Sequence, residues 1–440
     1  YGPVVTATDR RVPAAAPSAA ELPGHQSGNT HRGLSSRFVT VPIDLSSDAS
    51  FAAGFPHEFF SWLRAEQPLY WHEPTAETPD GEGFWVLSRY ADVAAVVRDP
   101  QRFSSETGGG LRSAGGTGIK DERAAGVSLN MTDDPQHRRL RALVNKGFTP
   151  KAVGSLQAQL EKRFADTLSG LDNSGFDVMT SIARELPLQT ICIVLGVPQS
   201  DRASLIGWID EGLQSDSPSI LAREPLKKIR DYAIELIHDK RSHPGADILS
   251  TIVRAQLEDG SALSDREAIA FFTLLFPAGA ETTRSALGGA IKAFIDYPQQ
   301  YQRLRAQPEL RRSAIEEIVR WTTPSVYKRR TASCDVHMLD QRIRAGDKVT
   351  FWEMSANRDE RVFPEPFRFD VSRWPNRHLG FGAGVHFCLG ASLARLELGI
   401  ALDALCQRYS GFEAAGAHRW TPNNRLLGLQ SLPVRAIPIQ

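Results

Sequence analysis

The segment from Phe381 to Gly390 constrains this chain more than any other part of its sequence. It reads Phe-Gly-Ala-Gly-Val-His-Phe-Cys-Leu-Gly, so that the thiol of Cys388 lies between a glycine-rich stretch and an expected helix start. Glycines let the backbone approach a flat ligand closely, and a thiolate needs neighbouring N–H donors to stay ionised and to hold a metal. The segment predicts a loop that presents Cys388 as a metal ligand. The alternative is a buried structural cysteine, the usual role of a lone Cys.

Composition narrows the class of protein. The chain has 440 residues of which 41% are hydrophobic, enough for a large globular core. Its 51 basic and 51 acidic residues cancel, so the net charge does not indicate binding to nucleic acid or to an anionic membrane. None of the four cysteines forms a Cys-x-x-Cys pair, which fits a reducing compartment better than a disulfide framework. No stretch approaches the ~20 apolar residues of a membrane span, and we expect a cytoplasmic protein.

Hydrophobic periodicity predicts a mainly helical chain. Residues 1–38 are rich in Ala, Pro, Gly and Ser, and we expect them to be a flexible leader or an added segment rather than a domain. Ser264 and Glu267 form a capping box that opens a long helix ending near Asp296. Other helices are expected over residues 90–97, 153–171, 181–195 and 225–238, strands over residues 83–88, 328–331, 347–351 and 426–437, and a long glycine-rich loop over residues 104–127.

A second motif, Ala278-Gly-Ala-Glu-Thr-Thr283, lies midway along the long helix. A carboxylate and a hydroxyl inside an apolar helix are costly to bury unless they are used or satisfied. The alternative is that Thr282 bonds a carbonyl of its own helix while Glu281 faces solvent. Pro277 cannot donate to the carbonyl of Thr273, so a bend is expected one turn before Thr282.

Two further motifs contain charged residues. Glu317 and Arg320 have the spacing of an i,i+3 ion pair, which is by default exposed and weakly stabilising. His137 and Arg141 are one helical turn apart on one face, and could bind anionic groups or belong to a solvated basic face. A zinc site at His386 and Cys388 would need a second ligand pair, and none with the usual spacing is available.

In their order along the chain, these motifs resemble those of the cytochrome P450 family, the haem-thiolate monooxygenases. The resemblance covers residues 39–440 as a single catalytic domain, and it looks closest to actinobacterial members that oxidise steroids, terpenoids or branched lipids. It implies a mainly α fold with small peripheral β-sheets, the triangular helical prism of the family. It also implies haem b (iron protoporphyrin IX), bound between the long distal helix and the proximal cysteine loop.

The resemblance assigns roles residue by residue. Cys388 would be the iron ligand, and Glu281 and Thr282 would be catalytic residues that deliver protons. The other residues expected to contact the cofactor are His137, Arg141, Arg330 and His386 at the propionates, Phe381, Gly382 and Gly390 in the loop, and Ala278 and Gly279 on the distal helix. Glu317, Arg320 and Arg368 would form a buried structural triad. The expected substrate pocket comprises Phe276, Ala280, Val326, Tyr327 and Leu427.

The implied reaction inserts one oxygen atom from O2 into an apolar small molecule such as a steroid, terpenoid, lipid or secondary metabolite. No flavin or iron–sulfur pattern occurs in the chain, so two electrons are expected from a ferredoxin and an NAD(P)H-dependent ferredoxin reductase. We expect a monomer that offers Arg138, Arg139 and Arg395 to that partner. Epoxidation or oxidative coupling, a peroxide-driven reaction, and a haem protein without turnover remain as alternatives.

Overall fold

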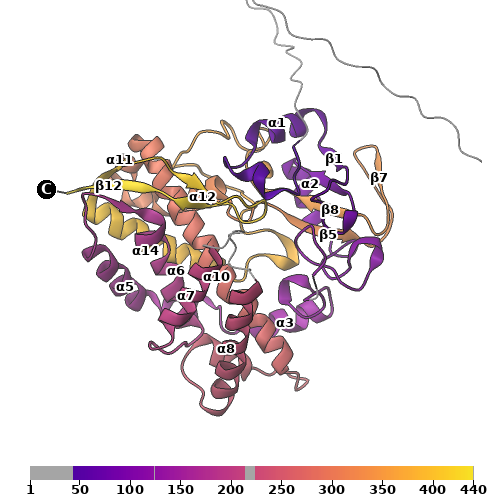
Figure 1. Cartoon of the computed structure of the whole chain (residues 1–440), viewed down its shortest axis with the longest axis horizontal. Coiled ribbons are helices and arrows are strands. Elements are labelled where there is room, and N and C mark those ends of the chain that lie inside the picture. The colour runs from indigo at the N-terminus through magenta and orange to yellow at the C-terminus, as the bar shows by residue number, and fades with distance from the viewer. Residues whose placement is uncertain (1–42, 123, 214–222, 440) are drawn as a thin grey trace, which may run out of the picture. The chain divides into compact units, whose positions relative to one another are not determined.

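The computed structural model of the chain describes residues 43–439, apart from residue 123 and residues 214–222 (Figure 1). The predicted leader, residues 1–38, lies outside the described residues. The helices are α1 His57–Glu66, α2 Tyr90–Val97, α3 Gln136–Asn145, α4 Pro150–Gly154, α5 Gln157–Ser169, α6 Glu185–Val194, α7 Arg202–Leu213, α8 Arg223–Ser242, α9 Ile248–Val253, α10 Asp265–Asp296, α11 Pro298–Ala306, α12 Arg311–Thr322, α13 Glu353–Ala356 and α14 Ala391–Arg408. The strands are β1 Leu69–His72, β2 Phe84–Leu87, β3 Phe103–Ser104, β4 Phe176–Asp177, β5 Lys328–Ala332, β6 Val336–Met338, β7 Gln341–Ile343, β8 Lys348–Phe351, β9 Tyr409–Ala414, β10 Arg419–Trp420, β11 Leu429–Ser431 and β12 Pro433–Pro438.

The sheets are small, and the largest joins segments that are far apart in sequence. Its strand order is β1-β2-β8-β5-β3, in which β2 and β8 run parallel and the other pairs antiparallel. Figure 1 shows the indigo N-terminal strands beside the orange strands β5 and β8, with α1 and α2 next to them and most other helices on the opposite side of the domain. A β4-β12-β9 sheet and two hairpins complete the β structure of the described residues. The domain is therefore mainly helical, as predicted.

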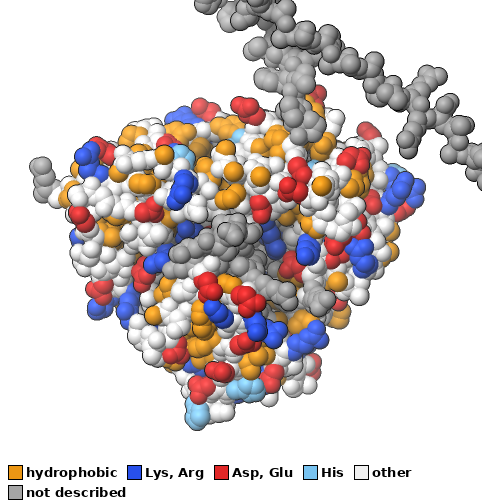
Figure 2. Space-filling view, in the orientation of Figure 1, with side chains coloured by type: hydrophobic (Ala, Val, Ile, Leu, Met, Phe, Trp, Pro, Cys, Tyr) orange, Lys and Arg blue, Asp and Glu red, His pale blue; other side chains and the backbone are white. Residues whose placement is uncertain are grey.

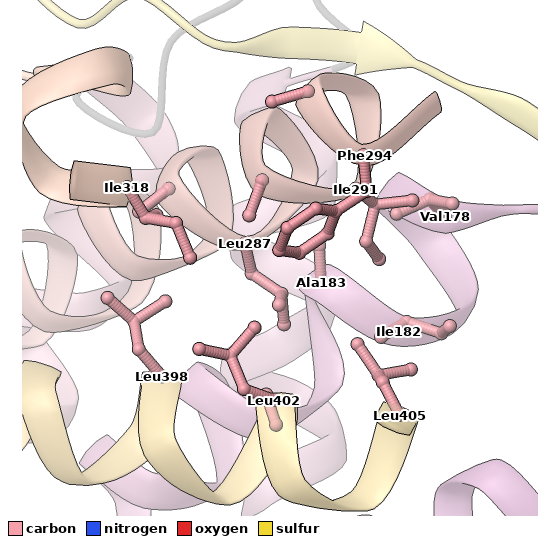
Figure 3. Packing of buried hydrophobic residues seen from close by; sticks show 14 of the residues in the cluster. Val178, Ile182, Ala183, Leu287, Ile291, Phe294, Ile318, Leu398, Leu402 and Leu405 are labelled. Carbon is pink, nitrogen blue, oxygen red and sulfur yellow. The ribbon is translucent and has the colours of Figure 1, made fainter. Parts of the chain in front are cut away.

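The long helix α10 is the centre of the helical part. Ser264 caps its first turn, and the reciprocal bond from Glu267 completes the predicted capping box. The helix continues through Pro277 to Asp296. Its second half packs against α12, α14 and the turn before α6, in a cluster whose side chains Figure 3 shows closely interdigitated. The labelled members are Val178, Ile182, Ala183, Leu287, Ile291, Phe294, Ile318, Leu398, Leu402 and Leu405. Burying a side chain of the size of Leu or Phe stabilises the fold by about 1.5–3 kcal/mol.

Two of the predicted helices are interrupted. The segment from residue 153 to residue 171 divides into α4 and α5, with Gly154 at the end of the first. The segment from residue 181 to residue 195 begins as a π-helical turn, Met179–Ala183, before α6. The periodicity of apolar side chains could not predict these interruptions, because the apolar face continues across both of them.

The surface agrees with the balanced charge of the sequence. Figure 2 shows Lys and Arg interspersed with Asp and Glu on the face in view, without a broad field of one sign. Among the described helices, none combines the length and the apolar character needed to cross a membrane.

Candidate active site

The cysteine loop holds Cys388 through its own backbone. The N–H of Cys388 donates to the carbonyl of Phe381 over 2.9 Å, and Gly382 has a φ of +69°, a conformation that L side chains rarely adopt. Burial raises the pKa of the Cys388 thiol, whereas the N–H of Gly390 and the charges of Lys328, Arg141 and Arg395 act to lower it. The side chain of Cys388 is nonetheless exposed, three residues before α14 begins. The loop thus presents a thiol that donors and cations surround.

The predicted basic residues gather around this loop. The ring of His386 lies 4.2 Å from the ring of His137, centroid to centroid. Burial lowers the pKa of His386 to about 2, and the charges of Arg330, His137 and Arg141 act in the same direction. Burial also lowers the pKa of Arg141, which the Cys388 thiol partly offsets. Three segments of the chain, α3, β5 and the cysteine loop, therefore bring His137, Arg141, Arg330 and His386 to one place.

Two residues that the sequence analysis missed support this cluster. The hydroxyl of Ser105 lies 3.1 Å from Nε2 of His386. The backbone N–H of Ser105 donates to Oδ1 of Asp133 over 2.9 Å. The charge of Asp133 also acts to raise the pKa of Arg330, against the larger lowering effect of burial. Asp133 lies just before α3, which starts at Gln136, so it links the glycine-rich loop to the helix of His137. Its position next to the His137 motif was the available signal.

Glu281 and Thr282, the acid and the alcohol of α10, make different hydrogen bonds. Thr282 Oγ1 donates to the carbonyl of Ala278 over 2.7 Å, which is the alternative that the sequence allowed for this hydroxyl. Glu281 does not face solvent, because only 6% of it is exposed and it accepts from Arg284 Nη1 over 2.9 Å. Burial raises the pKa of Glu281, and the charge of Arg284 opposes that rise. The carboxylate is thus buried and held from within its own helix.

The small residues of α10 lie in two different environments. Ala278 is exposed and Thr282 is partly exposed, although Pro277 and Ala280 beside them are buried. Gly279 instead faces α6, where an added Cβ would come within 3.0 Å of Ile191 Cδ1. The lack of a side chain at Gly279 therefore lets α6 and α10 pack closely, a role that the sequence did not suggest.

The buried triad contains a different arginine from the one predicted. The carboxylate of Glu317 accepts hydrogen bonds from Arg320 and from Nε of Arg373, which is 3.1 Å away. The side chains of Glu317 and Arg320 are both fully buried. Arg368 contributes only its carbonyl oxygen, which accepts from Arg320 and Arg373. Its side chain is 54% exposed and pairs with Glu365. The prediction for Arg368 is wrong, because its guanidinium lies at the surface beside Glu365 and Arg373 occupies the place next to Glu317.

The five residues predicted to line the substrate pocket are not brought together. Phe276 and Ala280 belong to a hydrophobic cluster of the helical part, together with Leu393 of α14. Val326, Tyr327 and Leu427 belong to a separate cluster beside the main sheet. All five are at least nine-tenths buried, so the structure places them in packed interior contacts. On that stretch of α10, Ala278 is exposed, and Gly279 and Thr282 are partly exposed.

The glycine-rich loop is fixed by ion pairs rather than lying free. Asp121 receives Arg329 Nη1 at 2.9 Å and Arg112 Nη2 at 2.8 Å. Lys348, whose side chain is 1% exposed, also lies 3.8 Å from Asp121. Such pairs of buried cations with carboxylates hold a loop firmly, because a lone buried charge is costly.

The three arginines expected to meet a redox partner also differ from one another. Arg138 is 79% exposed and makes an i,i+4 pair with Asp134. Arg139 is bound inward to Glu267, and Arg395 donates twice to Glu316, over 2.6 and 2.9 Å. Arg138 is therefore the one of the three whose charge is chiefly presented to solvent.

A groove of about 710 Å³ runs beside α14, and Ile315 and Ile400 of the cluster around α10 form part of its lining. It is bounded by α5, α12, α14 and residues 374–377. Trp374 is 59% exposed there, with the guanidinium of Arg312 over its ring at 5.1 Å. None of the residues predicted to contact a substrate lines this groove.

The donors around Cys388 fit a haem. Nε2 of His137 is buried and has no hydrogen-bond partner among the described residues, and an anionic group would satisfy it. The adjacent cations Arg141 and Arg330 suit two carboxylates of a buried ligand. The accessible thiol of Cys388, with the N–H of Gly390 as donor, is a ligand of the kind that haem iron takes.

Comparison with known proteins agrees with this site. The family model described as Cytochrome P450 matches residues 221–437. The chain is 46% identical over 401 residues to the Mycobacterium tuberculosis protein named cytochrome P450 126, covering 89% of this chain and 97% of the relative. It is 37% identical to the methyl-branched lipid omega-hydroxylase of the same organism, covering 85% and 90%. A Mycobacterium marinum cytochrome P450 solved with pseudoionone superimposes with a TM-score of 0.80 at 35% identity, covering 90% of this chain and 99% of that one. The chain belongs to the cytochrome P450 family of haem b monooxygenases.

Proposed function

We propose that this chain hydroxylates an apolar small molecule, with a steroid, terpenoid or methyl-branched lipid as the substrate class. The observation that carries the proposal is the accessible Cys388 thiol within the cluster of His137, Arg141, Arg330 and His386. Named relatives support the substrate class: a methyl-branched lipid omega-hydroxylase, a steroid C26-monooxygenase at 34% identity and a linalool 8-monooxygenase at 32% identity. All three names describe oxidation of largely apolar molecules.

In this proposal Cys388 ligates the haem iron, while His137, Arg141, Arg330 and His386 hold the propionates. The neutral His386 is oriented by Ser105, so it can offer a donor to a carboxylate without adding charge. Bound in this way, the thiolate-ligated haem supplies O2 activation with two external electrons. The protein's own contribution is to exclude water, to hold the substrate and to deliver protons.

Glu281 and Thr282 supply the protons. The Thr282 hydroxyl donates to Ala278 and can accept a hydrogen bond at the same time, so it can pass a proton along. Burial raises the pKa of Glu281, which favours its protonated form and so a carboxyl group that can donate a proton. Arg284 holds that carboxylate at 2.9 Å, one turn further along the same helix.

The electrons come from a ferredoxin and an NAD(P)H-dependent ferredoxin reductase in this proposal. Arg138 at the start of α3 is exposed and belongs to the same helix as His137 and Arg141. A positive charge at this position suits an acidic partner, because complementary charge raises the rate of encounter.

Spectral titration tests the proposal. The ferric haem band of the purified protein is recorded while steroids, terpenes and methyl-branched lipids are added, with Cys388→Ser as the control. We expect a low-spin to high-spin shift with one class, and loss of the thiolate signature in the ferrous CO spectrum of the control. Product formation is then compared with ferredoxin and reductase, and with hydrogen peroxide alone. Turnover with peroxide but not with the redox partners would contradict the proposal.

A further inference from the structure

Strand β5 carries three consecutive cations and directs them to two sides of the sheet. Side chains alternate along a strand, and Arg329 turns toward the glycine-rich loop to pair with Asp121 at 2.9 Å. Lys328 and Arg330 share the other side, where their charges act on Cys388 and His386 respectively. Lys328 is thus a cation of the cysteine-loop side of the sheet, although no sequence motif marked it.

A buried carboxylate accompanies Lys328 on that side. Lys328 Nζ forms an ion pair with Oε2 of Glu353, the first residue of α13, whose side chain is 1% exposed. Oε1 of Glu353 has no hydrogen-bond partner among the described residues. It lies 3.8 Å from the position that a Cβ on Gly382 would occupy. The carboxylate therefore lies between the ammonium group and the cysteine loop.

The charges around this pair are asymmetric. Burial raises the pKa of Glu353, and the charges of Lys328, Arg330 and His378 act against that rise. Lys328 itself is 29% exposed, so the pair is buried mainly on the side of the acid. An interaction between unit charges is several times stronger in such a partly buried place than in water. Removing either member should change the potential at the Cys388 sulfur, and the two changes should have opposite signs.

We propose that Lys328 and Glu353 form a positioning pair whose balance of charge tunes the reduction potential of the haem bound through Cys388. This inference rests on the proposed function, because it requires Cys388 to be the iron ligand. Reduction adds one negative charge to the cofactor. The ammonium of Lys328 stabilises the reduced state, and the carboxylate of Glu353 both holds that ammonium in place and opposes its effect. Neighbouring groups tune metal centres in this way through their charge and hydrogen bonds.

The test measures the reduction potential of the substrate-free holoenzyme by spectroelectrochemical titration. Lys328→Met removes the charge at nearly constant length, Lys328→Arg keeps it, and Glu353→Gln removes the opposing charge. We expect a lower potential for Lys328→Met, a higher one for Glu353→Gln, an intermediate value for the double variant, and little change for Lys328→Arg. Lys162→Met is the matched control, because Lys162 is 77% exposed on α5, where it pairs with Asp166.

Each outcome decides the proposal. Equal potentials for the wild type, Lys328→Met and Glu353→Gln would overturn it, and so would shifts of the same sign, which a general disturbance of packing would give. If Glu353→Gln does not retain haem, the difference between Lys328→Met and Lys328→Arg decides, and equal potentials for those two overturn the proposal. A wild-type protein without a thiolate signature in its ferrous CO spectrum would overturn the proposed function as well, so the two failures are distinguishable.

Discussion

Arg320 donates two hydrogen bonds to the carboxylate of Glu317, over 2.7 and 2.8 Å, and neither side chain is exposed to solvent. The same carboxylate accepts from the N–H of Asp370 and from Asn376 Nδ2, both over 3.0 Å. Glu317 therefore ties α12 to the segment that leads into the cysteine loop. Glu317→Gln leaves Arg320 as an uncompensated buried charge, and we expect it to lower the free energy of unfolding by about 3–5 kcal/mol. Urea-induced unfolding measures this loss, and a loss below 1 kcal/mol would contradict the prediction.

The choice between Arg373 and Arg368 gives a matched pair of variants. Arg373 reaches Glu317 with a side chain that is 11% exposed, whereas Arg368 is 54% exposed and pairs with Glu365. Arg373→Ala should reduce stability and haem retention, while Arg368→Ala should stay within about 0.5 kcal/mol of the wild type. Thermal unfolding and the haem-to-protein absorbance ratio measure both effects. A larger effect of Arg368→Ala would restore the arrangement that the sequence suggested.

Thr282 offers a test of proton delivery. Thr282→Ala removes the hydroxyl that lies on the accessible face of α10, so fewer protons should reach the bound oxygen in step with the electrons. We expect product per NAD(P)H consumed to fall and hydrogen peroxide release to rise, each by several-fold. Thr282→Ser keeps a hydroxyl and should behave like the wild type. Unchanged coupling in Thr282→Ala would remove Thr282 from proton delivery.

The buried carboxyl group of Glu397 should make the stability of the folded protein depend on pH. This residue of α14 is 2% exposed, and burial raises its pKa to about 8, opposed by the hydroxyl of Thr190. The folded protein therefore holds a proton that the unfolded chain releases above pH ~4.5. Stability should fall as pH rises from about 5 to about 8, by an amount on the order of a few kcal/mol, and then level off.

Glu397→Gln should flatten this pH dependence, because an amide has no proton to lose. Glu66→Gln is the control, since Glu66 is exposed at the end of α1 and should leave the profile unchanged. Urea unfolding of the three proteins at intervals between pH 5 and pH 8 provides the measurement. Parallel profiles for the wild type and Glu397→Gln would show that Glu397 is ionised in the folded protein.

Arg138 tests the site of electron delivery. Its guanidinium is 79% exposed, so Arg138→Glu should lower the ferredoxin-driven rate on the order of 2- to 10-fold at low salt, and weaken its dependence on ionic strength. Reversing the charge of Arg139 or Arg395 would break the ion pair with Glu267 or Glu316, so it would test both docking and structure at once. Lys162→Glu on α5 serves as a surface control. Equal rates for Arg138→Glu and the wild type would place the partner elsewhere.

Local sequence was sufficient where the cause of a structure is itself local. The capping box of Ser264 and Glu267, the extent of α10 and the strand near residues 84–87 follow from caps and periodicity within a few residues. The cysteine loop belongs to the same class, because its glycines and the bond from Cys388 to Phe381 span only eight residues. The family could therefore be identified from the sequence before any contact between distant segments was known.

Only the tertiary structure decided which side chains meet across those segments. Arg373 rather than Arg368 reaches Glu317, whereas Arg368 pairs with Glu365 at the surface, and the spacing of these arginines along the chain did not distinguish them. Lys328 joins the cysteine-loop side because β5 pairs with β8, which places Glu353 next to it. Spacing along the chain fixes the face of a helix or strand, but the partner of that face depends on how elements far apart in sequence pack. That packing decides which charges are buried and therefore which of them can act on Cys388.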